Sequence, residues 1–374
     1  MVFKIKYKDK KSDARVGILK TKSGSVETPF FMPVATKTAV KFIDSKRLSE
    51  IGIRVIISNA LILSFRPGVD VVKKLGGIGK FMNFNGINFS DSGGFQMYSD
   101  SIYIKSGDTG VLFRNPINGS KVFMTPEENM KIQINLGGDV AMCLDRMPLY
   151  EESKKEIKKA VELTSKWARR CKKEHDLLQK NIKKEKRQLL FGISQGGIYK
   201  DLREESIRGL VEMNFEGYAV GGFGMGETFN EKMKIVKHQK EIIPENKPVY
   251  LMGIGNPIEI LEAIGYGFDI FDSKMPTQNA RRGTLFTSNG KLKILNKKFE
   301  IDKSPIDKNC KCFVCKNYSR AYVRFLLKEE ESVGKELASY HNIYYLQNLL
   351  RQAKEEIKKN NFKEFIKKIK KKYS

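Results

Sequence analysis

The feature of this sequence that most constrains its fold is a regular alternation of apolar runs with helical patterns. Several of the runs are continuously apolar, which is typical of parallel strands buried on both faces. Eight runs predict strands: 28–36, 54–60, 87–95, 139–148, 189–197, 217–223, 248–255 and 268–273. Strand–helix alternation over eight units predicts an α/β fold of the (β/α)8 barrel type, with a doubly wound sheet as the alternative.

Three segments between the runs have a strong helical pattern. They are 151–178, 202–214 and 256–267. The last begins with Asn256 as a predicted N-cap and Pro257 at the first helical position, where a missing N–H is tolerated. Helical patterns lie between most of the predicted strands.

Antiparallel additions to the barrel are predicted at two places. The turn sequence at 22–25 predicts a hairpin before the first barrel strand, and residues 111–130 predict an inserted hairpin followed by a helix that Thr125 caps. After about residue 300 the pattern changes to a cysteine cluster and helices. We therefore expect a barrel domain with N-terminal strands over 1–300, and a helical subdomain packed on it over 301–374.

The charge of the chain favours a polyanionic partner. Its 69 Lys and Arg outnumber 43 Asp and Glu, giving a net charge of +26, so nucleic acid is the first partner to consider. The alternative is a lysine-rich composition without that meaning, because runs such as 366–374 are usually solvated helix faces. No run of about 18 apolar residues and no signal-peptide core stand in the sequence, so we expect a cytoplasmic protein with no membrane partner.

Four of the predicted strands have a polar residue towards their carboxyl end, where a barrel places its active site. These residues are Asp91, Asp145, Gln195 and Asp272. A single Asp after a strand is usually an N-cap, so capping is the alternative explanation for each acid. Three carboxylates together with an amide favour a pocket. Three glycine-rich stretches are expected beside this pocket: 92–94, 195–197 and 220–226. Because glycine has no side chain, a flat ligand can come close to the backbone there.

The cysteines predict a metal centre. Cys310, Cys312 and Cys315 form a C-x-C-x2-C pattern, and His341 follows 26 residues after Cys315. Three thiolates and one imidazole make a closed tetrahedral zinc site with no open position for water. The alternative, three thiols that are close by chance, explains three cysteines within six positions poorly. The sequence therefore predicts one structural Zn²⁺ per subunit.

Seven motifs together resemble those of the tRNA-guanine transglycosylases. They are DSGGFQ (91–96), FRNPINGS (113–120), FGISQGG (191–197), GYAVGG (217–222), YLMGIG (250–255), FDSKMPTQNARRG (271–283) and CKCFVCKNYSRAY (310–322). The resemblance extends from residue 27 to the final helices and is nearest to the bacterial-type catalytic subunit. It implies a (β/α)8 barrel with a zinc subdomain, a homodimer, and exchange of the wobble guanine of a tRNA with a GUN anticodon for a 7-deazaguanine, in queuosine biosynthesis.

The resemblance also implies roles for the acids. Asp272 is the expected nucleophile: it would attack C1′ of the ribose and form a covalent aspartyl-ribosyl intermediate. Asp91 would give a proton to the leaving guanine and later take one from the incoming base. Such a group must be protonatable near neutral pH, so we expect burial to raise the pKa of Asp91.

Recognition of base and RNA is expected from residues around these acids. Asp145 would accept hydrogen bonds from N1 and N2 of guanine, and Gln195 and the Gly222 N–H would donate to O6. Stacking would come from Phe95 and Met252. Ser92 and Phe223 complete the expected base-binding set. The expected RNA-binding residues are Arg281, Arg282 and Gln278.

Several positions depart from the family pattern. Arg146 and Met147 stand where an acid and a cysteine are usual, and Met225 also replaces a smaller residue. Bulky methionines favour a small 7-substituent, aminomethyl first. Glu227, which matches an acid of the family, is expected to influence that choice. Gln278 stands where a third cation is usual.

Three alternatives to the main hypothesis stay open. A non-catalytic tRNA-binding subunit of a heterodimer is one, although it should lack the nucleophile and the pocket acids. A related enzyme that inserts queuine or 7-cyano-7-deazaguanine is another. The third is an enzyme with the same chemistry that acts on DNA.

Overall fold

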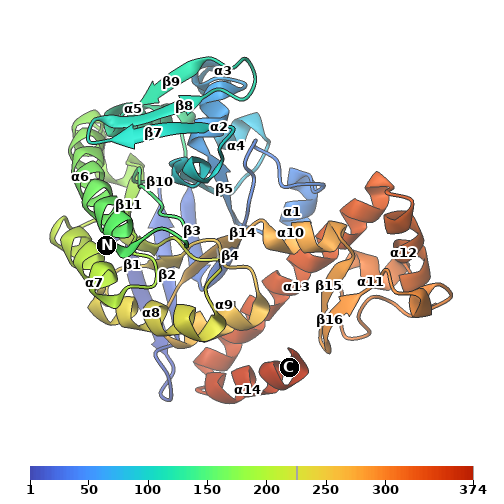
Figure 1. The fold of residues 1–374 in the computed structure, drawn as a ribbon. Helices are drawn as coiled ribbons and strands as arrows, with labels where there is room; N and C mark the ends of the chain where they lie inside the picture. Colours follow the sequence, from blue (N-terminus) through green and yellow to red (C-terminus); the bar gives the residue numbers. More distant parts are fainter. Residues whose placement is uncertain (225, 374) are drawn as a thin grey trace.

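The computed structural model describes residues 1–224 and 226–373, and its centre is an eight-stranded parallel sheet (Figure 1). The strands are β4 (Phe30–Pro33), β5 (Val55–Asn59), β6 (Ile87–Asp91), β10 (Val140–Met142), β11 (Leu189–Ser194), β12 (Gly217–Val220), β13 (Val249–Leu251) and β14 (Ile270–Ser273). Each lies inside one of the eight predicted runs. The predicted strands and their parallel pairing are confirmed.

The sheet closes on itself. Its first and last strands meet through a parallel bridge between Val34 and Ile57, and the Ala35 N–H donates to the Ile57 carbonyl at 2.7 Å. A doubly wound sheet would leave two open edges. The barrel is therefore the correct alternative.

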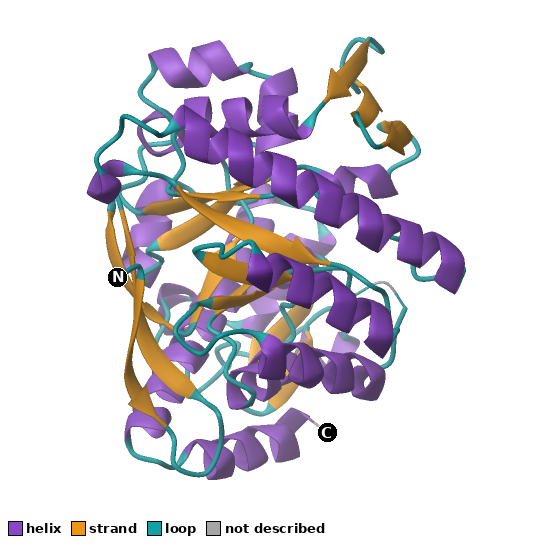
Figure 2. Cartoon of the chain, turned by 90° about the vertical axis from the view of Figure 1, so that its left-hand side faces the viewer, coloured by secondary structure: helices purple, strands orange, loops and turns teal. Residues whose placement is uncertain are grey.

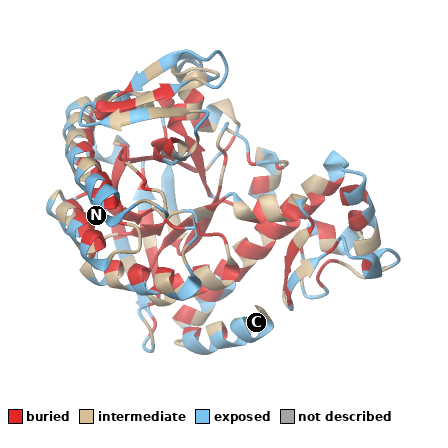
Figure 3. Ribbon diagram, viewed as in Figure 1, coloured by how far each residue is buried: buried red, intermediate tan, exposed pale blue. Residues whose placement is uncertain are grey.

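Helices surround the strands, with buried inner and exposed outer faces (Figures 2 and 3). Those of the barrel are α1 (Ser45–Ile51), α2 (Ala60–Phe65), α3 (Val69–Lys74), α4 (Ile78–Phe81), α5 (Pro126–Leu136), α6 (Lys154–Leu178), α7 (Lys200–Glu212), α8 (Phe229–Ile242), α9 (Pro257–Gly265) and α10 (Met275–Arg281). The predicted caps are present: Asn256 accepts from the Ile258 N–H and Thr125 from the Glu128 N–H. Both bonds satisfy N–H groups that a helix start leaves free.

The N-terminal strands cover the barrel at the amino ends of its strands. The predicted hairpin is β2 (Arg15–Thr21) with β3 (Gly24–Thr28), and β1 (Phe3–Lys8) adds a third strand. Phe3 packs in the same buried cluster as Phe89 and Phe191 of the barrel interior. The Arg15 guanidinium, also buried, pairs with Asp269 just before β14 at 2.5 and 3.0 Å. This end of the barrel is filled, so a ligand must enter from the other end.

The remaining elements are one inserted sheet and a C-terminal region. They are β7 (Tyr103–Gly107), β8 (Gly110–Arg114), β9 (Lys121–Met124), β15 (Thr284–Thr287), β16 (Gly290–Lys293), α11 (Phe313–Asn317), α12 (Arg320–Lys328), α13 (Ser332–Lys358) and α14 (Phe362–Tyr373). The inserted hairpin β8–β9 is confirmed, with β7 as an unpredicted third strand. Helix α13 runs from the cysteine cluster back to the barrel, where it contacts α10 and β4 (Figure 1). The domain boundary at residue 300 stays a prediction.

Candidate active site and metal centre

A cavity of about 940 Å³ opens at the carboxyl ends of the barrel strands. Its lining brings together residues at the ends of all eight barrel strands and from the helix after β14. Nine of the residues expected at the site line it: Asp91, Phe95, Asp145, Gln195, Gly222, Phe223, Met252, Asp272 and Gln278. The pocket expected from the polar strand ends is therefore present, and capping does not explain these acids.

Three of the expected residues lie outside the lining. Ser92 is buried behind the cavity, where its hydroxyl donates to Asp145 at 3.3 Å. Arg281 is partly buried, with its guanidinium 5.7 Å from the ring centroid of Phe42. Arg282 is exposed next to it. Both arginines sit on or directly after α10, the helix that follows the strand of Asp272.

One oxygen of Asp272 is held by two donors. The Tyr250 hydroxyl donates to Oδ1 at 2.6 Å, and the Gly253 N–H donates to the same oxygen at 2.8 Å. This fixes the carboxylate and leaves Oδ2 as the oxygen that can reach a substrate. Burial raises the pKa of Asp272, and the two hydrogen bonds oppose the rise.

Asp91 is placed to hold a proton near neutral pH. The Asn59 amide donates to Asp91 Oδ2 and to Gln96 Oε1, both at 2.8 Å. Burial, and then the charges of Asp145 and Asp272, raise the pKa of Asp91 to about 7. The expected rise is confirmed, and its physical causes are desolvation and repulsion between carboxylates.

Asp145 and Gln195 form a fixed pair beside these acids. Gln195 Nε2 donates to Asp145 Oδ2 at 2.7 Å, and burial raises the pKa of Asp145 to about 6. The backbone passes so close that glycine is required at two points. A Cβ on Gly94 would stand 2.1 Å from Asp145 Oδ1, and one on Gly222 would stand 2.4 Å from Gln195 Oε1. Gly222 also has φ +76°, a conformation that other residues rarely adopt.

Sequence reasoning missed three residues of this site. Tyr250 donates a hydrogen bond to Asp272, and Asn59 donates one to Asp91. Arg203 on α7 is fully buried and joins the ends of β11 and β12, because it donates to the carbonyls of Gly197 at 2.7 Å and Gly221 at 2.8 Å. Tyr250 could have been found, since it stands two residues before Met252 in one strand and thus on the same face. Nothing in the charged pattern of α7 marked Arg203.

The departures from the family pattern have different consequences. Arg146 is not part of the cavity lining and pairs with Glu152 at 3.0 Å, whereas Met147 lines the cavity and is 7% exposed. Met225 lies outside the described residues. Glu227 accepts from the Gly224 N–H at 2.5 Å and lies 3.4 Å from the Lys232 ammonium. The acid expected to influence the loop is therefore bonded to it.

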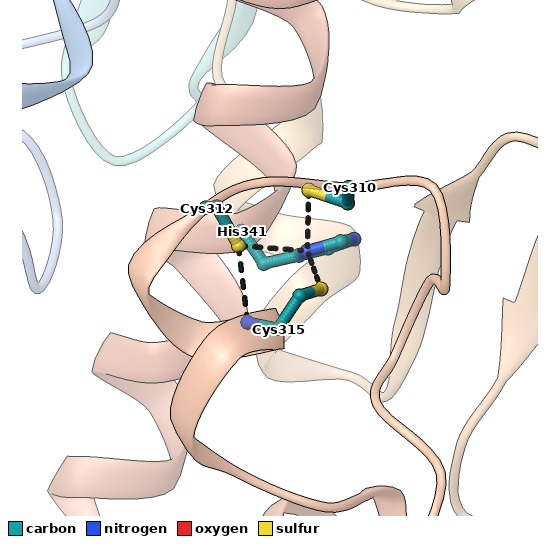
Figure 4. A group of neighbouring side chains, drawn as sticks. All are labelled: Cys310, Cys312, Cys315 and His341. Carbon is teal, nitrogen blue, oxygen red and sulfur yellow. Dashed lines mark hydrogen bonds between the residues drawn. The ribbon is translucent and has the colours of Figure 1, made fainter.

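The metal-binding residues are brought together as expected. Cys310, Cys312, Cys315 and His341 offer ligand atoms within 4.8 Å of one another (Figure 4). The three sulfurs lie 3.9, 3.5 and 3.4 Å from His341 Nδ1, and His341 Nε2 lies 2.7 Å from the Phe286 carbonyl. That second bond turns the lone pair of Nδ1 towards the sulfurs.

These separations fit one particular metal geometry. Tetrahedral Zn²⁺ with three thiolates and an imidazole needs sulfur–nitrogen separations of roughly 3.6 Å. Cys312 is also the N-cap of α11 and accepts from the Cys315 N–H at 3.3 Å, which orients the loop around the site. The Cys3His group can therefore hold a metal ion.

Among the described residues, 1–224 and 226–373, the helices are all too short or too polar to span a membrane.

The fold and the acidic cavity define a barrel enzyme with a separate metal-binding group. A family profile described as queuine tRNA-ribosyltransferase matches residues 9–374. Proteins named queuine tRNA-ribosyltransferase are similar over most of their length. The one from Thermoanaerobacter sp. is 46% identical over 99% of this chain and 98% of its own, and the one from Lysinibacillus sphaericus is 43% identical over 97% and 94%. The one from Staphylococcus aureus is 44% identical over 95% and 92%.

The chain belongs to the queuine tRNA-ribosyltransferase family. It is thus an enzyme of the pentosyltransferase class, and the family resemblance expected from its motifs is confirmed.

Proposed function

We propose that this enzyme exchanges the wobble guanine of tRNAs with a GUN anticodon for 7-aminomethyl-7-deazaguanine, through a covalent intermediate. The tRNA guanine exchange itself follows from family membership. The observation that carries the chemistry is the convergence of Asp272, Asp91 and Asp145 on one cavity. A non-catalytic subunit would have no need of three acids in one cavity, where their partial desolvation is costly.

The reaction needs two displacements at one carbon. Oδ2 of Asp272 attacks C1′, the bond from C1′ to N9 of guanine breaks, and Asp91 supplies the proton with which guanine leaves. The incoming base then loses a proton to Asp91. Its N9 attacks C1′ and releases Asp272, so the configuration is retained and the RNA chain stays intact.

The cavity also has groups that suit a guanine-type base. Asp145 can accept from N1 and N2, while Gln195 and the Gly222 N–H can donate to O6. Phe95 is 42% exposed and lines the cavity together with Met252, so both side chains can contact a bound base. Ser92 supports Asp145 from behind.

Base exchange into tRNA tests the proposal directly. The enzyme is incubated with labelled guanine and tRNA transcripts that carry a UGU anticodon loop or a scrambled one. We expect incorporation into the first transcript alone. Incorporation into neither would overturn the proposal, and incorporation into a DNA hairpin of the same sequence would favour the related DNA enzyme.

The choice of incoming base is a second prediction. Met147 narrows the cavity, and the acids that line the cavity favour a cationic 7-substituent. In competition with labelled guanine, 7-aminomethyl-7-deazaguanine should bind at least about tenfold more tightly than queuine or 7-cyano-7-deazaguanine, a difference of about 1.4 kcal/mol. Met147→Ala should reduce the difference in affinity between 7-aminomethyl-7-deazaguanine and queuine, but should leave the difference from 7-cyano-7-deazaguanine unchanged. Equal competition by queuine in the unmodified enzyme would contradict the prediction.

Replacing Asp91 with Asn should reduce exchange by roughly 100-fold. The same change should stabilise the folded protein at alkaline pH. Between the ordinary pKa of 3.8 and the folded value of about 7, the folded protein binds more protons than the unfolded chain. Its stability therefore falls as pH rises through this window, by up to about 4 kcal/mol for this group.

Thermal unfolding of both proteins from pH 4 to pH 8.5 checks this prediction. The stability advantage of Asp91→Asn should be absent near pH 4, grow up to about pH 7 and stay constant above it. An advantage that did not change with pH would show that the pKa of Asp91 is not raised. Asp70→Asn, the same chemical change at an exposed position of α3, is the control.

We further infer that the metal bound by the Cys3His group is a structural Zn²⁺.

We also infer that the enzyme is a homodimer. Support for the dimer comes from exposed apolar side chains on α11, α12 and the start of α13: Phe313, Tyr322, Phe325 and Val333. Exposed clusters of large apolar side chains are typical of protein interfaces. A monomeric mass in sedimentation equilibrium at micromolar concentration would contradict the dimer.

A further inference from the structure

The cation that the family pattern leads one to expect at position 278 has a counterpart one helical turn earlier. Lys274 stands two residues after Asp272, and its carbonyl accepts from the Gln278 N–H at 3.0 Å. Residues four apart lie on the same side of a helix. Lys274 and Gln278 both line the cavity, so the cavity has a cation on the same side of the helix as Gln278 and closer to Asp272 in the sequence.

A second lysine lines the same cavity from the neighbouring strand end. β4 and β14 are paired with Pro33 opposite Ser273, so the segments that follow them leave the barrel side by side. Lys274 follows Ser273 directly, and Lys37 lies in the loop after Pro33. That loop is fixed by the Ala35 N–H bond to Ile57 and by the Thr38 N–H bond to Ala35 at 2.9 Å.

Both lysines have a charge that is available to a ligand. Each is exposed, and neither takes part in an ion pair with another described residue. Lys232, a third lysine of the lining, differs because it is 5% exposed and lies between Glu227 at 3.4 Å and Glu259 at 3.0 Å. Its charge is already balanced inside the protein.

The cavity requires positive charge at this point. Four acids line it, of which Glu259 is paired with Lys232, and a ribose attacked by Asp272 brings two backbone phosphates towards the other three. Like charges repel more strongly where the surroundings exclude water. Lys274 also lies over the ring of Phe95, with the ammonium 5.2 Å from its centroid. The ammonium group is thus beside the ring that would stack on the target base.

We propose that Lys37 and Lys274 form a clamp that binds an RNA backbone phosphate next to the ribose attacked by Asp272. The inference rests on the proposed function, because it takes that ribose as the reacting group. It assigns these two lysines the task of offsetting the repulsion between phosphate and cavity acids. A lysine binds phosphate as a point charge, so it holds the backbone without reading the sequence.

The test is the salt dependence of the Kd for an anticodon stem-loop RNA. Lys274→Gln and Lys37→Gln should each weaken binding roughly fivefold to tenfold at low salt. Each should also reduce the slope of log K against log salt by about 0.7, the value for one contact to a single strand. Lys274→Arg should restore the slope. Lys6→Gln, an exposed site on β1 at the opposite end of the barrel, should leave binding unchanged.

A neutral linkage in the RNA locates the contact. A single methylphosphonate on the 5′ or the 3′ side of the target guanosine should reduce the slope of log K against log salt for the unmodified enzyme by the same amount. It should cause no further reduction for the variant that carries both Lys37→Gln and Lys274→Gln. If Lys37→Gln and Lys274→Gln had the same salt slope as Lys6→Gln, the clamp proposal would be overturned. Because binding is measured, this result stays distinct from a failure of the proposed function, which would appear as no guanine incorporation by the unmodified enzyme.

Discussion

Asp272→Asn is expected to lower base exchange at least about 1,000-fold and to abolish the denaturation-resistant adduct between enzyme and tRNA. The amide cannot donate an electron pair to C1′ as a carboxylate does, so the glycosyl-enzyme cannot form. The Asn carbonyl can still accept from Tyr250 and Gly253, which now bind Oδ1 of Asp272. The variant should therefore fold and bind RNA.

The measurement is a denaturing gel of enzyme mixed with labelled tRNA, alongside guanine exchange and the Kd for tRNA. Asp70→Asn is the matched control: it makes the same chemical change at an exposed residue, and both adduct and exchange should persist. An adduct that survived Asp272→Asn would show that another residue is the nucleophile. Asp91 and Asp145 would then be the candidates, because they line the same cavity.

Removal of the metal is expected to have the largest effect on stability. Chelation, or Cys312→Ser, should cost at least about 3 kcal/mol of unfolding free energy, because structural Zn²⁺ contributes folding energy directly. Cys312 is buried and caps α11, and His341 lies on α13, which packs against α10. Loss of the metal should thus disturb the helix that carries Gln278 and Arg281.

Metal content, thermal unfolding and the spectrum of a Co²⁺-substituted protein check this prediction. We expect one zinc per chain and the absorption bands of a tetrahedral thiolate site. Cys171→Ser is the control for the loss of a buried thiol: it should reduce stability but keep one metal per chain. A protein isolated without metal, or one whose unfolding temperature ignores a chelator, would contradict the assignment.

The fold was predictable because the barrel strands have an unusual composition. A run such as that around β11 is apolar on both faces, since its side chains point either into the barrel or towards the helices. The strands β1 and β7 were missed because most of their residues are not buried, so burial constrains their composition little. The path of α13 across the barrel was also missed, because no local pattern states which distant surface a helix will cover.

The acids of the candidate site were predictable for a different reason. In a barrel every strand delivers its last residue to the same end, so Asp91, Asp145 and Asp272 could be expected to meet before their distances were known. Their partners depend on strand order. Asn59 reaches Asp91 because β5 and β6 pair with these two residues opposite each other. Such a pairing is not visible in a single sequence.

The sequence by itself determined the eight strands, the acids at their ends and the spacing of the metal-binding residues. These follow from hydrophobic burial and ligand chemistry, which act on each segment locally. The tertiary structure alone decided which charges help to raise the pKa of Asp91 to about 7, that Arg146 pairs with Glu152 outside the cavity lining, and that Lys274 and Lys37 line the same cavity as Asp272. Charge and desolvation depend on distances between segments far apart in the chain, and only the folded barrel fixes those distances.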